Sequence, residues 1–138
     1  MASTMTPMKT PTMEQQRASF AWAASEQGLQ KASDKYTKLA KGTPALIMNS
    51  GLMQTLAFLK DKNEAQHQQL LQHLLQWLCT RFDGEATLHP QHPFPRGQTP
   101  AFEPMMQALF HAKPQQFQRA SSEAMMILRW IRQLASAR

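Results

Sequence analysis

Apolar residues recur every three or four positions along most of the chain, which is the period of an amphipathic α-helix. The pattern predicts helices at about residues 13–27, 29–41, 45–49, 52–60, 64–81, 104–112 and 114–137. Thr12 and Gln15 have the spacing of a capping box at the first of these. Gly28 allows a break before the second, and residues 42–44, which end in Pro44, predict a break or a kink after it, because glycine and proline disfavour helix interiors.

Residues 41–62 contain two short apolar runs joined by a turn. Gly51, or Asn49 before it, can adopt the left-handed conformation that ends a helix. The run that follows, residues 52–60, is apolar on most of its circumference, and such a helix is usually covered by neighbours on several sides. We therefore predict that residues 52–60 form the central helix of a small bundle.

The strongest apolar stripe lies in residues 64–81 and ends with Phe82; it consists of Leu70, Leu71, Leu74, Leu75, Leu78 and Phe82. Residues 83–104 hold five prolines and two glycines, which exclude a long helix and predict a mobile loop before the last two helices. Residues 1–11 have no continuous apolar run and predict a disordered tail. The remainder, residues 12–138, is expected to form a single helical domain.

Composition supports an all-α single-domain bundle of about six helices (five to seven). The 138 residues include no valine and only three isoleucines, whereas Leu, Met, Ala and Gln are abundant and suit helices. Cys79 is the only cysteine, which excludes an intrachain disulfide and fits a reducing compartment. No apolar run is long enough to span a membrane. These features predict a cytoplasmic protein without a membrane partner.

The formal net charge of +6 is distributed unevenly, because residues 29–62 hold six lysines against two acidic residues. On one continuous helix Lys31, Lys35, Lys38 and Lys41 would lie opposite the apolar stripe, in a row about 15 Å long. Lysine is a flexible point charge that suits contacts to phosphates rather than to bases. The row therefore predicts a nucleic-acid-binding face, and a basic face that is merely solvated is the alternative. Further candidates are Lys60, Arg17, Arg129 and Arg132.

Tryptophans, histidines, acidic residues and serines are the other residues that could carry chemistry. Trp22 and Trp130 have flat rings that could stack on bases, but the pattern favours a core or subunit interface. His89, His92 and Cys79 are too few for a structural zinc site, and the remaining histidines, His67, His73 and His111, are scattered along the sequence. The acidic residues and serines form no catalytic arrangement. We therefore predict no metal, no cofactor and no enzymatic activity.

Two blocks of the sequence resemble a known family. Residues 35–60 include a Pro-Ala-Leu-Ile run at 44–47 and a Gly-Leu-Met-Gln-Thr-Leu-Ala-Phe run at 51–58, and residues 117–135 include Glu-Ala at 123–124 and Leu-Arg-Trp-Ile at 128–131. Together they resemble the small all-helical subunit of the type III-B CRISPR effector, the RNA-guided Cmr complex. Ser50 between Asn49 and Gly51, and Ile131 in place of leucine, are departures from the family pattern.

The resemblance implies a non-catalytic subunit in antiviral defence. Such subunits stack beside the repeating backbone subunits, next to further copies of themselves, along the guide RNA and target RNA, and touch the large polymerase-like subunit. Sequence selection would come from base pairing between guide and target. The lysine face would then contact the RNA backbone. The alternative is a helical adaptor that binds only protein, and a small enzyme would require a cluster of titratable residues that the sequence does not show.

Overall fold

The computed structural model describes residues 10–97 and 101–138. This part of the chain contains six α-helices and no strand, which confirms the predicted all-α class. The helices are α1 (Met13–Ala32), α2 (Asp34–Ser50), α3 (Leu52–Lys62), α4 (Ala65–Arg81), α5 (Phe102–Phe110) and α6 (Pro114–Ala137). The predicted tail falls mostly on residues 1–9, outside the described residues.

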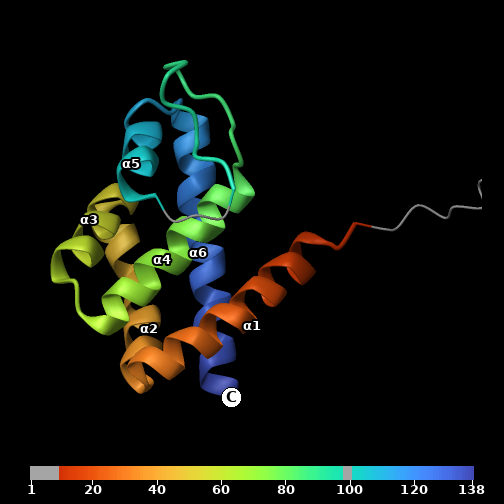
Figure 1. Ribbon diagram of the computed structural model, residues 1–138, viewed down its shortest axis with the longest axis vertical. Coiled ribbons are helices and arrows are strands. Elements are labelled where there is room, and N and C mark those ends of the chain that lie inside the picture. Colours follow the sequence, from red (N-terminus) through yellow and green to blue (C-terminus); the bar gives the residue numbers. More distant parts are fainter. Residues whose placement is uncertain (1–9, 98–100) are drawn as a thin grey trace, which may run out of the picture.

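Helix α6 occupies the centre of the bundle, where it packs against α1, α2 and α4 (Figure 1). Helix α3 packs mainly against α2 and α4 at one edge. The prediction that residues 52–60 form the central helix is therefore wrong. The longer α6 fills that place because its buried stripe runs for about four turns and includes Ala120, Ala124, Ile127, Leu128 and Ile131.

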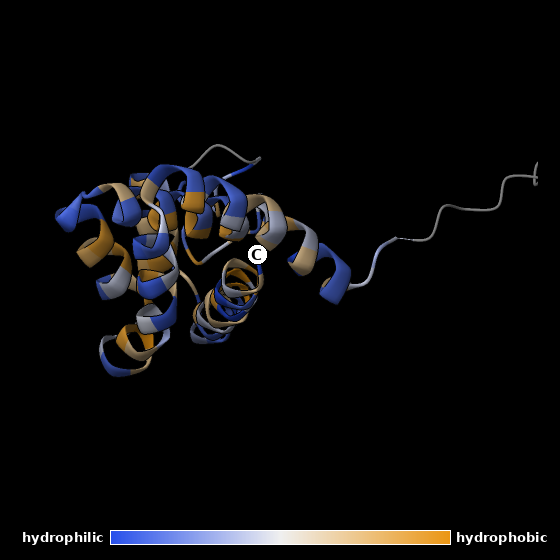
Figure 2. Ribbon diagram, turned by 90° about the horizontal axis from the view of Figure 1, so that it is seen from below, coloured by the Kyte–Doolittle hydropathy of each residue, from blue (hydrophilic) through white to orange (hydrophobic). Residues whose placement is uncertain are grey.

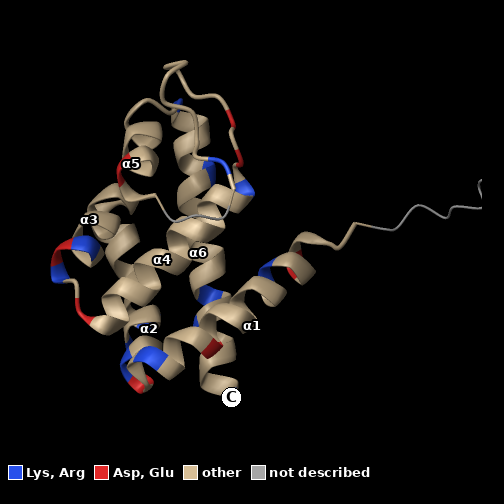
Figure 3. Cartoon of the chain, in the orientation of Figure 1, with Lys and Arg blue, Asp and Glu red and all other residues tan. Residues whose placement is uncertain are grey.

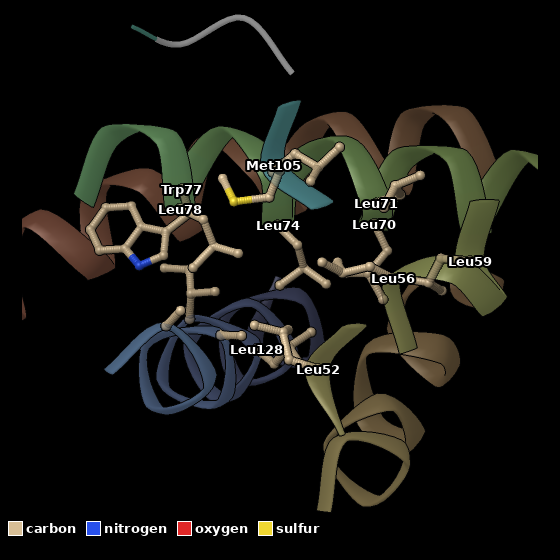
Figure 4. Close-up of a cluster of buried hydrophobic side chains, with 14 of the residues drawn as sticks. Leu52, Leu56, Leu59, Leu70, Leu71, Leu74, Trp77, Leu78, Met105 and Leu128 are labelled. Atoms are coloured by element: carbon tan, nitrogen blue, oxygen red, sulfur yellow. The ribbon is translucent and has the colours of Figure 1, made fainter. Parts of the chain in front are cut away.

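Leucines from α3 and α4 form one buried cluster of the core, together with Met105 of α5 and Leu128 of α6 (Figure 4). The predicted stripe of α4 is buried along its whole length. Hydrophobic and hydrophilic residues alternate along the helices (Figure 2), as amphipathic helices around a shared core require. Burying each large apolar side chain contributes about 1.5–3 kcal/mol, so this core is the main source of stability.

Gly28 does not break the first helix, which continues to Ala32. Its backbone lies against the ring of Tyr36, and a Cβ at Gly28 would come within 2.5 Å of three ring carbons. The break comes at Ser33 instead, where φ is 54°, and α2 begins at Asp34. The glycine thus makes room for the tyrosine ring, and packing of that ring outweighs glycine's low helix propensity.

The predicted break at residues 42–44 is also absent, because α2 runs through Pro44 without interruption. Tyr36, Ala40, Thr43 and Ile47 form a buried stripe along this helix, so tertiary packing supports helix on both sides of Pro44. Just before the proline, Thr43 Oγ1 donates a hydrogen bond to the carbonyl oxygen of Leu39 (2.6 Å). The stop predicted at Gly51 is confirmed, with φ at 88°.

The Pro-rich segment between α4 and α5 is tied to the bundle over its described part. Phe94 is buried, and its ring centroid lies 5.2 Å from that of Phe82. The amide of Phe94 donates to the carbonyl oxygen of Glu85 (2.9 Å), and the amide of Leu88 donates to the carbonyl oxygen of His111 (2.8 Å). Mobility of residues 83–104 stays a prediction. Helix α5 begins at Phe102, two residues before the predicted start.

A polar chain links three side chains from α1, α2 and α4, of which Tyr36 and His73 are buried and Gln27 is exposed. The hydroxyl of Tyr36 lies 2.7 Å from Nδ1 of His73, and Nε2 of His73 lies 2.9 Å from Oε1 of Gln27. Because that amide oxygen can only accept, Nε2 donates and Nδ1 accepts from Tyr36, which makes the imidazole neutral. Burial lowers the pKa of His73 to about 4.

The two helical glycines offer a matched test. We expect Gly28→Ala to destabilise the protein by about 1–3 kcal/mol, because the new methyl group must displace the Tyr36 ring. We expect Gly42→Ala to stabilise it by about 0.5–1 kcal/mol, because no atom lies within 4 Å of the added Cβ. Urea unfolding measures both. Equal effects of the two substitutions would contradict the proposed packing.

The neutral state of His73 predicts a pH dependence of stability. Its pKa rises from about 4 in the folded chain to its ordinary value of 6.5 on unfolding, so below pH 6.5 the unfolded chain takes up the proton first. The free energy of unfolding should therefore fall by about 2 kcal/mol between pH 7 and pH 5 on account of this residue. Unfolding curves of His73→Gln should show a shallower pH slope than those of the original protein.

Candidate nucleic-acid interface

Three of the predicted lysines share the solvent face of α2. Lys35, Lys38 and Lys41 are all exposed, on the side of the helix opposite the buried stripe. Gly42 and Ala45, also exposed, are the next residues on this face, so no bulky side chain stands beside the ammonium groups. The three lysines span six residues, or about 9 Å along the axis.

Lys31 does not belong to this row, because it lies in the last turn of α1, before the break at Ser33. The prediction that four lysines form a row on one helix is therefore wrong for Lys31 and correct for the other three. Lys38 forms an ion pair with Asp34 (3.3 Å), in which both side chains are more than 70 % exposed. A pair so open to water is weak, and it leaves the positive charge available to another anion.

The other candidate cations lie at separate places. Lys60 is in the last turn of α3, with its Nζ 5.7 Å from the centroid of the Phe102 ring. Arg129 and Arg132 are exposed on α6. Figure 3 shows basic residues in several groups, with acidic residues among them, rather than in one continuous band. The face of α2 is therefore the most concentrated basic surface among the candidate residues.

Arg17 is engaged inside the protein. Its Nε and Nη2 donate to the two carboxylate oxygens of Glu123 at 3.2 and 2.7 Å, and only 13 % of the side chain is exposed. Trp77 Nε1 donates to the same carboxylate (3.1 Å), and so does Arg81 Nε (3.3 Å). Arg17 is thus a structural residue joining α1 to α6, and its guanidinium is not free to bind a phosphate.

The sequence pattern alone does not identify Glu123 as the buried acceptor of this network. Burial alone would raise the pKa of its carboxyl group, but hydrogen bonds from Arg17 and Trp77, with the charges of Arg17 and Arg81, hold that pKa below its usual value. A signal was present, because Glu123 is the one acidic residue of α6 and lies on its apolar stripe next to Ala124.

Three histidines that are distant in sequence meet at one end of the bundle. The ring of His89 lies 4.7 Å from that of His92 and 5.1 Å from that of His111, between centroids. The expectation that His111 stands apart is therefore wrong. Cys79 lies in the buried core of α4. Among residues 10–97 and 101–138, no group of three or more His, Cys, Asp or Glu is arranged to hold a metal ion.

The two tryptophans differ in their surroundings. Trp130 is partly buried against the core, as its position in the pattern indicates. Trp22 is 53 % exposed on α1, and the guanidinium carbon of Arg138 lies 3.7 Å from its ring centroid. Arg138 also donates to the carbonyl oxygen of Trp22 (3.3 Å), which holds the guanidinium over the ring. Trp22 is therefore a surface residue rather than a core residue.

A comparison with protein families matches residues 13–138 to the family described as CRISPR-associated protein (Cas_Cmr5). The chain belongs to this family. The match spans all six helices and confirms the resemblance seen in the two sequence blocks. No curated protein matches the chain significantly.

Membership of the Cas_Cmr5 family makes this protein a CRISPR-associated subunit of a Cmr effector complex, which contains other protein subunits. Proteins of this family are in general small and non-catalytic. None of the helices in the described residues is both long and apolar enough to cross a membrane. In this Cas_Cmr5 protein the core and the Glu123 network therefore position surfaces for contact with other components.

The Glu123 network predicts unequal effects of two neutralising substitutions. Glu123→Gln should destabilise the protein by about 3 kcal/mol, because it leaves the guanidinium of Arg17 buried without a charge partner. Glu85→Gln should cost less than about 1 kcal/mol, because the Glu85–Arg119 ion pair (3.2 Å) is exposed. Chemical denaturation at pH 7 measures both, and a Glu123→Gln protein as stable as the original would contradict the assigned role.

Proposed function

We propose that this protein is the small structural subunit that supports RNA in a Cmr complex, with the solvent face of α2 against the phosphate backbone. Lys35, Lys38 and Lys41 supply the contacts. Lys31, at the end of α1, and Lys60, Arg129 and Arg132 extend the contact where RNA passes them. The observation that carries the proposal is the exposed three-lysine face in a member of a CRISPR-associated family.

The geometry of α2 supports backbone contact rather than base readout. Three ammonium groups within about 9 Å can neutralise successive phosphates and release their counterions. Gly42 and Ala45 beside them leave space for close approach by a strand. No aromatic residue lies on this face of α2, so base stacking has no platform there. Binding through α2 should therefore be independent of sequence.

A helical adaptor that binds only protein is the second candidate function. The observations that favour it are the modest number of lysines on α2 and the Asp34–Lys38 ion pair, which lowers the local charge. In that case the lysines keep the subunit soluble, and RNA in the complex is held by other subunits. The two functions predict different affinities for RNA when only the charge of the α2 face is reversed: weaker binding if the face contacts RNA, and unchanged binding if it does not.

The test is reversal of the three lysines in the assembled complex. We expect the triple variant Lys35→Glu, Lys38→Glu, Lys41→Glu to bind RNA roughly tenfold more weakly near 0.2 M salt. The slope of log K against log salt should lose about 2, because three phosphate contacts on a single strand are removed. Mobility shift with RNAs of unrelated sequence measures both quantities.

A matched control separates this face from overall charge. The control reverses Lys62, Arg96 and Lys113, which are exposed elsewhere, to Glu. It lowers the formal net charge by the same six units, from +6 to 0. This control should bind RNA with nearly the original affinity. Equal affinity of the α2 variant and the unaltered protein would support the adaptor function instead, provided that circular dichroism shows intact helices in both.

A further inference from the structure

A groove of about 870 Å³ lies between α1 and α4, on a different surface from the lysines of α2. Along α1 its lining runs from Gln15 to Gln27, which corresponds to about 18 Å of helix, and Thr10 and Pro11 line it before the helix begins. On α4 the lining runs from His73 to Thr80. Its volume is that of a site for a large ligand, and its length along α1 is that of about three turns of helix.

The floor of the groove is apolar, and its walls are polar but uncharged. The rings of Phe20 and Trp77 lie 5.2 Å apart between centroids. Glutamines from both helices contribute to the walls, and no Lys, Arg, Asp or Glu lines the groove. Burial lowers the pKa of His73 to about 4, so its imidazole, bonded to Tyr36 and Gln27, is neutral at pH 7. In a chain with a net charge of +6, this surface has no cation to offer a phosphate.

The glutamine side chains keep hydrogen-bonding capacity. Gln27 uses its amide oxygen on His73, which leaves its two N–H donors without a partner in the described residues. Gln16 donates to the carbonyl oxygen of Pro11 (2.9 Å), and its own oxygen is unused within the same residues. Gln76 forms no side-chain hydrogen bond there. The groove thus presents donors and acceptors above an aromatic floor, which suits a peptide segment with apolar and uncharged polar side chains.

A second copy of this chain offers no suitable helix for the groove. The exposed large hydrophobic residues of the described chain are Trp22, Met48, Leu88, Phe110 and Met126. Four belong to four different helices and one to the Pro-rich segment, so no helix carries two of them three or four residues apart. A helix that fills a groove needs such a stripe of anchors. Among the described residues, a second copy therefore has no helix with the apolar stripe that this groove would take.

We propose that the groove between α1 and α4 docks an amphipathic helix from a different protein subunit of the Cmr complex, one whose inserted face is apolar and uncharged. The inserted side chains pack on Phe20 and Trp77, and the flanking polar groups bond to Gln16, Gln27 and Gln76. This inference rests on membership of the complex, which the family match shows, and not on RNA contact through α2.

A matched pair of substitutions tests the docking site. Gln76→Arg places a positive charge in the groove, and Gln133→Arg places the same charge at an exposed position of α6 outside it. We expect Gln76→Arg to reduce recovery of this chain with an affinity-tagged subunit of the co-expressed complex at least tenfold. Gln133→Arg should leave recovery within twofold of the original. Ala23→Arg, at an exposed position in the groove, should repeat the loss and guards against misfolding of the first variant.

Photo-crosslinking identifies the occupant. A benzophenone amino acid replacing Ser19 in the groove should join this chain to another protein subunit in an RNase-resistant adduct, whereas the same group at Gln133 should not. Three crosslinking results would overturn the proposal: an RNase-sensitive adduct, an adduct between two copies of this chain, or no adduct beyond that of Gln133. Unchanged recovery of folded Gln76→Arg and Ala23→Arg proteins with the complex would overturn it as well. The α2 lysine variant should still assemble, so failure of either proposal is distinguishable from failure of the other.

Discussion

The buried carboxylate of Glu123 is the interaction on which the arrangement of the largest helices depends. It stands on α6 and accepts hydrogen bonds from Arg17 of α1 and from Trp77 and Arg81 of α4. Apolar packing alone permits helices to slide and rotate against each other, whereas a charge in a low-dielectric interior must find its partners. The network therefore sets the register of α1 and α4 on α6, and the groove between α1 and α4 follows from that register.

A second constraint is the close packing of Tyr36 on Gly28. It brings the start of α2 against α1, directly after the break at Ser33. Because α2 then continues through Pro44 as one helix, its buried stripe stays in phase from Tyr36 to Ile47. The lysines on the opposite side consequently face solvent together. The same packing separates Lys31 from them, so the basic surface is shorter than one continuous helix would have made it.

The two surfaces differ in chemistry in a way that fits a subunit with two kinds of neighbour. The face of α2 is basic and otherwise small, with Gly42 and Ala45 beside the lysines. The groove has aromatic rings below amide groups and no charged lining residue. The lysines of α2 attract a polyanion, and the uncharged groove does not. A helix with an apolar, uncharged face binds more favourably in the groove than on α2. The fold keeps them on different helices, the basic face on α2 and the groove on α1 and α4, so both can be occupied at once.

Much of this protein was determined by local sequence. The helix period, the absence of valine, the leucine stripe of α4 and the stop at Gly51 predict the fold class and most helices, because each depends on residues within one or two turns. The breaks predicted from Gly28 and Pro44 are absent, because contacts with Tyr36 and along the buried stripe of α2 outweigh the low helix propensities of glycine and proline. Only the tertiary structure decided that α6 is central, that Arg17 pairs with Glu123 rather than facing solvent, that His111 joins His89 and His92, and that a groove separates α1 from α4. These features depend on contacts between residues far apart in the chain, and no local pattern records which partner a buried charge or a tyrosine ring will meet.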